Sequence, residues 1–134
     1  MRLFNQVDLL ARGLDAAWLR QGVISQNIAN VNTPGYSAKR VDFETAFLNA
    51  LNTGGFAARR TRTGHIDFGD GQSPLDVTPT VAANDHYVMR MDGNNVDIEQ
   101  ETTALAENTI RYDLLATKLN AELARLKLAI REGR

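Results

Sequence analysis

Cysteine is absent from this chain of 134 residues, which excludes both a disulfide framework and a thiolate metal site. Long hydrophobic runs are absent too, because no stretch approaches the roughly 18 apolar residues of a membrane-spanning helix. Residues 1–6 lack the basic segment and apolar core of a secretory signal. We therefore expect no membrane span, and a protein of this kind that works outside the cytoplasm would leave by another route.

An excess of charge of one sign is also lacking. The 15 Lys and Arg residues nearly balance the 16 Asp and Glu residues, which gives a formal net charge of −1. A chain that binds nucleic acid through its phosphates usually carries a strong basic excess. We therefore expect no nucleic acid among the partners.

The two ends of the chain carry matching heptad patterns, with apolar residues at alternating steps of four and three. A helix with such a stripe stays apolar on one face until a partner helix covers it. Only Gln21 breaks the apolar run at the N-terminal end. The pattern comprises Leu3, Val7, Leu10, Leu14, Ala17, Gln21, Ile24, Ile28 and Val31 at one end, and Ile98, Thr102, Leu105, Thr109, Tyr112, Ala116, Leu119, Leu123, Leu126 and Ile130 at the other.

These stripes predict a mainly α fold in which two long terminal helices pair as an antiparallel, coiled-coil-like bundle. The first helix is expected over residues 4–30. The second is expected over 97–132, capped by Asn95 or Asp97 and about 50 Å long at 1.5 Å per residue. That length suits a stave in a larger bundle, which points to assembly between molecules, although a helical hairpin within one molecule is the alternative.

A sharp turn is predicted where the first helix ends. Pro34 disfavours helical geometry at Thr33, and Pro34-Gly35 suits the two central positions of a type II turn. Asn30 can satisfy exposed carbonyls at the helix end. If Gly35 has positive φ, a β-branched residue there should damage the turn.

The middle of the chain has no sustained pattern. We expect residues 1–51 to hold the first helix, the turn and a short segment with Phe43 and Phe47, and residues 93–134 to hold the second helix. Between them, residues 52–92 contain the glycines and prolines that break helices, and they are expected to be flexible or a small irregular β unit. The runs 75–77 and 86–89 are weak candidates for strands.

Candidate chemical sites are few. His65 with Asp67, and His86 with Asp85, could be metal ligands or acid–base pairs, but neither pair has a nucleophile or a third ligand nearby. The segment 92–97 resembles a calcium loop but lacks glycine at its sixth position, so a turn with a helix cap is the better interpretation. The basic patch 59–62 is read as a solvated loop. We expect no catalysis, no cofactor and no metal.

Trp18 lies one position beyond the first apolar stripe. It either widens that stripe within one molecule or anchors a contact between subunits, since tryptophan is favoured at interface hot spots. The residues expected to pack helices or to mediate assembly are Leu10, Leu14, Trp18, Ile24, Leu105, Tyr112, Leu119, Leu123 and Leu126.

The end of the first helix resembles the N-terminal signature of the bacterial flagellar rod and hook family. That signature reads N-I-A-N, two variable positions, T-P-G-Y and a downstream phenylalanine. The matching residues here are Asn27, Ile28, Ala29, Asn30, Thr33, Pro34, Gly35 and Tyr36, with Phe43 and Phe47 downstream. The segment 92–97, followed by a polar helix with Asn108, Arg111 and Tyr112, is similar to the proximal-rod branch of this family.

The resemblance implies a non-catalytic structural subunit of the basal-body rod, the shaft that carries torque from motor to hook. It implies export through the flagellar type III apparatus, without a cleaved signal, to the rod in the periplasmic space. The implied partners are other rod proteins, the MS-ring and export-gate adaptor, and further copies of the chain. The alternatives are a cytoplasmic helical adaptor or chaperone and, far behind, an enzyme using His65 or His86.

Overall fold

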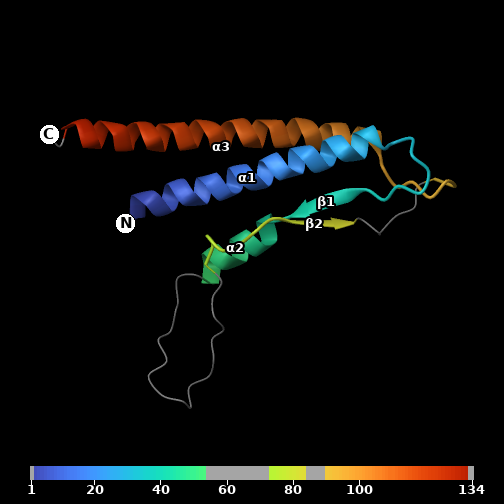
Figure 1. Cartoon of the computed structure of the whole chain (residues 1–134), viewed down its shortest axis with the longest axis horizontal. Helices are drawn as coiled ribbons and strands as arrows, with labels where there is room; N and C mark the ends of the chain where they lie inside the picture. The colour runs from blue at the N-terminus through green and yellow to red at the C-terminus, as the bar shows by residue number, and fades with distance from the viewer. Residues whose placement is uncertain (1, 54–72, 84–89, 133–134) are drawn as a thin grey trace, which may run out of the picture.

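The structure, a computed structural model, describes residues 2–53, 73–83 and 90–132 (Figure 1). Three helices dominate it: α1 spans Arg2–Ala29, α2 spans Glu44–Thr53 and α3 spans Ile98–Glu132. Two short strands, β1 (Lys39–Asp42) and β2 (Thr80–Ala83), form an antiparallel pair. The mainly α architecture with a small β element in the middle is confirmed.

The helices α1 and α3 lie side by side and run in opposite directions (Figure 1). Near the end of α1, Asn27 bonds Glu101 of α3 over 3.0 Å. Further back, Asn108 of α3 donates to the Ala17 carbonyl over 2.9 Å, and an added Cβ on Gly13 would lie 3.5 Å from Leu115. As the residue number falls along α1, the number of the contacting residue rises along α3. This order confirms the predicted antiparallel pairing.

The two long helices differ in length. The helix α1 has 28 residues and α3 has 35. At the turn the C-terminal end of α1 and the N-terminal end of α3 lie at the same level, side by side (Figure 1). At about 1.5 Å per residue, the seven extra residues carry α3 roughly 10 Å beyond the start of α1. Leu128 and Ile130 in this overhang are exposed.

The face of α3 that turns toward α1 agrees with the predicted stripe at every second position. Leu105, Tyr112, Leu119 and Leu126 are partly buried as expected, but the positions between them lie one residue earlier than predicted. The intervening residues of the real face are Glu101, Asn108, Leu115 and Glu122, whereas the predicted Ile98, Thr102, Thr109, Leu123 and Ile130 are exposed; the predicted Ala116 is partly buried, as Leu115 is. The prediction was wrong at 102 and 109 because it followed the four-and-three spacing alone, whereas Glu101 and Asn108 are the residues that hydrogen-bond to α1.

The small sheet was not predicted at its true positions. Val41 pairs with Val81 across β1 and β2. The expectation of a strand at 75–77 was wrong, because Asp76 donates its N–H to the Ser73 carbonyl over 2.8 Å and closes a turn there. The other expected strand, 86–89, lies outside the described residues.

The fully buried apolar core lies between α1 and the layer formed by the sheet and α2. Figure 1 places this layer on the side of α1 away from α3. Phe43 stacks on Phe47 with 4.9 Å between ring centroids, and Phe47 and Leu19 of α1 are partly buried residues that pack against the core. The buried members of the core are Ala16, Val23, Val41, Phe43, Ala50 and Val77. The helix α1 therefore lies between two layers, with α3 on one side and the sheet and α2 on the other (Figure 1).

The start of α3 is capped as expected. The Asp97 carboxylate accepts the N–H of Glu99 over 2.9 Å and that of Gln100 over 3.4 Å, satisfying two of the donors that a helix start leaves unpaired. Asp92 accepts the N–H of Asn94. The segment 92–97 is thus a turn followed by a helix cap.

Replacing Phe43 by alanine should lower the free energy of unfolding by about 3 kcal/mol, since a buried ring is lost and a cavity remains. Phe43 is 6% exposed, whereas Phe4 is 66% exposed. Phe4→Ala should therefore change stability by less than about 0.5 kcal/mol. Urea denaturation followed by circular dichroism measures both; equal effects would mean that the core lies elsewhere.

Candidate assembly site

The turn predicted after the first helix is present. The Tyr36 N–H reaches the Thr33 carbonyl over 3.3 Å, with Pro34 and Gly35 at the central positions. Gly35 has a φ of +70°, which confirms the expected positive value. Proline at the first central position and a positive-φ glycine at the second are the requirements of a type II turn.

A second glycine with positive φ lies against the first. Gly93, with a φ of +78°, follows Asp92, and the Asp92 carbonyl accepts the N–H of Gly35 over 2.9 Å. A Cβ added to Gly93 would lie 3.6 Å from the Cα of Gly35. Two segments some 60 positions apart in the sequence therefore meet backbone to backbone. We name this meeting of residues 27–36 with 92–97 the junction.

Asn94 is the residue that holds the junction together. Its side chain is fully buried, and its Nδ2 donates to the carbonyls of Asn30 over 3.0 Å, Val31 over 3.2 Å and Thr33 over 2.8 Å. Its Oδ1 accepts the N–H of Val96 over 2.7 Å. A helix leaves its last carbonyls without partners. Here an amide from the other end of the chain satisfies the carbonyls just beyond α1.

Asn27, on α1, is a second buried amide that hydrogen-bonds to distant segments of the chain. Its Nδ2 donates to the Lys39 carbonyl over 2.8 Å and to the Glu101 carboxylate, and its Oδ1 accepts the N–H of Lys39 and the hydroxyl of Tyr36. The buried amide thus makes four hydrogen bonds to three residues, on β1, on the turn and on α3. One side chain therefore fixes three elements relative to α1.

The surroundings of Asn27 disfavour negative charge. Burial raises the pKa of Glu101, and Asp97 adds to this, although the hydrogen bond from Asn27 opposes it. Burial also raises the pKa of Tyr36, with Glu101 contributing. The phenol therefore stays protonated and remains a donor to Asn27 at neutral pH.

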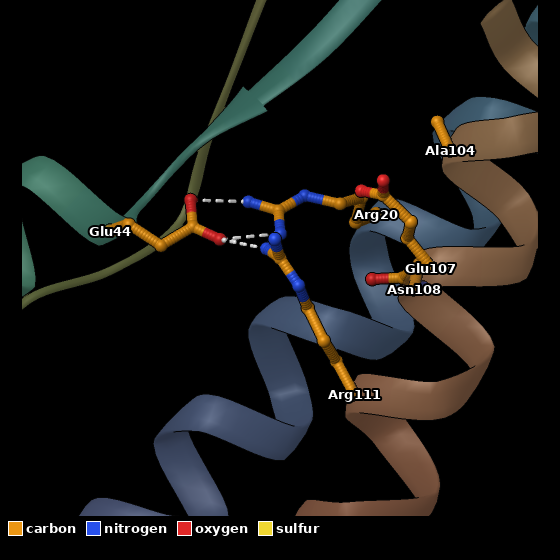
Figure 2. Close-up of a pocket in the computed structure, with 6 residues that line it drawn as sticks. All are labelled: Arg20, Glu44, Ala104, Glu107, Asn108 and Arg111. Carbon is orange, nitrogen blue, oxygen red and sulfur yellow. Dashed lines mark hydrogen bonds and ion pairs between the residues drawn. The ribbon is translucent and has the colours of Figure 1, made fainter.

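A second polar cluster ties α2 to both long helices. The Glu44 carboxylate accepts two hydrogen bonds from the Arg20 guanidinium, over 2.6 and 2.5 Å, and one from Arg111 over 3.2 Å. Figure 2 shows the two guanidinium groups, from α1 and α3, converging on this carboxylate. The hydrogen bond from Arg20 is the main cause that lowers the pKa of Glu44.

Asn108 lines the same pocket as Arg20, Glu44 and Arg111, and it makes a buried polar contact between α1 and α3. Asn108, 2% exposed, donates to the Ala17 carbonyl and, over 2.7 Å, to the side chain of Gln21. Gln21, the polar interruption of the predicted stripe, thus has its partner directly opposite. Among the described residues the Oδ1 of Asn108 has no partner. A polar pair inside an apolar interface favours one register over others.

The residues of the sequence motif are not all alike. Asn27 is buried, Ile28, Asn30 and Tyr36 are partly buried, and Ala29 is exposed with Thr33, Pro34 and Gly35. Among the expected packing residues, Ile24 is buried and Leu10, Leu14, Leu105, Tyr112, Leu119 and Leu126 are partly buried, whereas Trp18 is 70% exposed and Leu123 46% exposed. Trp18 therefore does not widen the interface between α1 and α3. Sequence reasoning missed Asn94, which looked like one of several turn asparagines.

The structure does not describe the residues of the histidine-containing sites or of the basic patch considered in the sequence. His65, Asp67, Asp85, His86 and the basic patch 59–62 lie outside the described residues. Within the part of the chain that is described, no cluster of His, Cys, Asp or Glu side chains could hold a metal ion. None of the described helices is both long and apolar enough to cross a bilayer.

Comparison with known proteins agrees with this geometry. The family model described as "Flagella basal body rod protein" matches residues 8–36, which run from α1 through the turn. A protein of Bacillus subtilis (strain 168), "Flagellar basal body rod protein FlgB", is 34% identical over 135 residues, covering 100% of both chains. Proteins of the same name from Salmonella typhimurium and Escherichia coli K12 are 32% and 30% identical, covering 85% of this chain and 84% of theirs.

The chain therefore belongs to the flagellar basal body rod family, whose members are structural and not catalytic. Within that family it is similar to the FlgB proteins over most or all of its length. The resemblance inferred from the sequence motifs is confirmed, and so is the expectation that the chain is not an enzyme.

Asn94→Asp should destabilise the protein by about 2 kcal/mol or more. The change keeps the size of the side chain but removes the Nδ2 donor, leaving three carbonyls without that partner and a carboxylate oxygen facing them. Asn120→Asp, at an exposed position on α3, is the matched control. The midpoint of urea denaturation measures both; equal midpoints would show that the junction does not depend on this amide.

The ion pair of Glu44 should make stability depend on pH. Because the folded pKa of Glu44 is lowered, its contribution is present above the ordinary value of about 4.5 and is lost as the pH falls through the folded value. Glu44→Gln should therefore reduce the melting temperature more at pH 7 than at pH 3. The cost at pH 7 should stay below about 1 kcal/mol, since the carboxylate is half exposed.

The control is Asp113→Asn, an exposed carboxylate on α3. It shows how far the loss of one exposed negative charge changes the melting temperature at each pH. Glu101, whose pKa is raised mainly by burial, is present in the wild type and in both variants. A Glu44→Gln effect that was the same at both pH values would contradict the ion pair's role.

Proposed function

We propose that this chain is a subunit of the proximal part of the flagellar rod, joined head to tail to other rod proteins and to its own copies. It would pass torque from the motor toward the hook. The observation that carries the proposal is the junction. Through Asn27 and Asn94 it fastens the C-terminal end of α1 to the N-terminal end of α3, so that the two long helices form one elongated unit. Load entering one long helix is then shared with the other.

Location and export belong to the same proposal. We infer that the protein reaches the periplasmic rod through the flagellar type III apparatus and there meets the MS-ring and export-gate adaptor. The two terminal helices would act as a coiled coil toward these neighbours. We also propose that both ends of the chain are partly disordered before assembly, which would ease passage through a narrow channel.

Electron microscopy of cells lacking the gene tests the proposal. Deletion should remove hook and filament, and a plasmid copy of the wild-type gene should restore them. Normal flagella after deletion, with no second copy in the genome, would reject the rod assignment and favour a cytoplasmic adaptor.

The plasmid also tests the turn. Gly35→Val should fail to restore flagella, because a positive φ costs an L-residue about 1–2 kcal/mol and a β-branched one more. Asn32→Val, in the same exposed turn at a residue without positive φ, should restore them. Full restoration by Gly35→Val would mean that the turn does not control assembly.

A further inference from the structure

The helix α1 has three faces, and only two are covered. One meets α3 and another meets the core. The third, the outer face of α1, repeats at steps of four and three like a packing seam. It carries exposed aromatic residues at Phe4 and Trp18, which are 66% and 70% exposed. Its members are Phe4, Asp8, Ala11, Asp15, Trp18, Gly22, Ser25 and Ala29, and all but the partly buried Ala11 are exposed.

The helix α3 has a second seam of the same kind. It lies on the side opposite the residues that meet α1, since it is offset from them by two positions, or about 200° on a helix. Ile110, Leu114 and Leu128 in it are 70%, 59% and 55% exposed. The members of this outer face of α3 are Ile110, Leu114, Thr117, Ala121, Ala124 and Leu128, all exposed. An apolar seam of this length that faces only water indicates a missing partner.

The charges on the two outer faces match each other. Asp8 and Asp15 lie seven residues apart within the outer face of α1. Arg111, Lys118 and Arg125, also seven apart, line one edge of the outer face of α3. Seven residues span about 10 Å of helix in both rows. The acidic row and the basic row therefore have the same spacing along their helices.

These charges remain available to a partner. Asp8, Asp15 and Lys118 form no ion pair with any other residue that the structure describes. Arg111 and Arg125 do form ion pairs, but their side chains stay 58% and 73% exposed.

Opposite charges do occur near each row. Arg12, partly buried, follows Asp8 at the border of the acidic row, and Asp113 lies on the far edge of the outer face of α3. Neither interrupts its row.

We propose that the outer face of α1 in one molecule packs against the outer face of α3 in a second copy. Two α3 faces would bring basic rows together, and two α1 faces would bring acidic residues together, so like faces repel and unlike faces attract. A contact between two different faces leaves one of each face free on every pair, so it can continue from copy to copy, into a ring or, where the rotation between copies does not close, into an open helical assembly. The inference rests on the proposed function and names the surfaces through which it operates.

Gly22 fits this contact and has no other explanation within the described chain. It lies in the interior of α1, where glycine costs about 1 kcal/mol relative to alanine. A Cβ there would meet nothing within 4 Å. Beside it, Trp18, Val23 and Val81 line a mostly apolar groove. A missing side chain next to an exposed tryptophan lets a partner helix approach closely.

Cysteine cross-linking tests the contact directly, because the chain has no cysteine of its own. Full-length Asp15→Cys and Lys118→Cys, one carrying a tag that changes its size, are purified, mixed and oxidised. The mixed dimer should exceed each like dimer at least fivefold. Asn52→Cys, exposed at the end of α2 and outside both faces, replaces either variant as the control. A mixed yield no higher than with this control would overturn the proposal.

Charge reversal supplies an independent readout with both proteins folded. Asp15→Lys in the Trp18→Cys background should reduce cross-linking to Leu114→Cys at least fivefold, and Lys118→Glu in the partner should restore it. Failure of the second change to restore cross-linking would show that the rows do not face each other. These results do not depend on the deletion experiment, so a failure of the contact can be distinguished from a failure of the proposed function.

Discussion

The fold depends on how the backbone is satisfied where α1 ends. A helix end leaves carbonyl groups without hydrogen-bond partners. When another segment of the chain buries such carbonyls, each unpaired group lowers the stability of the fold. Asn94 satisfies the carbonyls of Asn30, Val31 and Thr33 from a segment more than 60 residues away. Because it lies just before α3, this one amide also sets where the second long helix begins beside the first.

From that fixed end, α1 organises two unequal interfaces. Toward α2 and the sheet it buries an apolar core with Phe43 at its centre. Toward α3 its contacts are partly exposed and include the hydrogen-bonded pair of Gln21 and Asn108. Burial of apolar surface stabilises the first side, and the polar pair on the second side favours one register of the two long helices. Glu44 joins the two sides through one arginine on each long helix.

Much of this was predictable from local patterns. Heptad spacing predicted both long helices, Pro34-Gly35 predicted the turn, and Asp97 was one of two expected caps. The short strands could not be predicted, because four residues around Val41 become a strand only when a distant segment pairs with them. Part of the α3 interface was misplaced by one residue, because heptad spacing alone does not show that Glu101 and Asn108, rather than Thr102 and Thr109, make the hydrogen bonds to α1. Asn94 was missed because the residues around it do not show whether an asparagine in a turn is exposed or is buried against a distant segment.

The unequal lengths of α1 and α3 have a mechanical consequence. Because the helices start level at the turn, the last turns of α3 extend about 10 Å past the start of α1. Over most of the unit's length two helices share a bending or twisting load. Over the overhang α3 carries that load without α1 beside it.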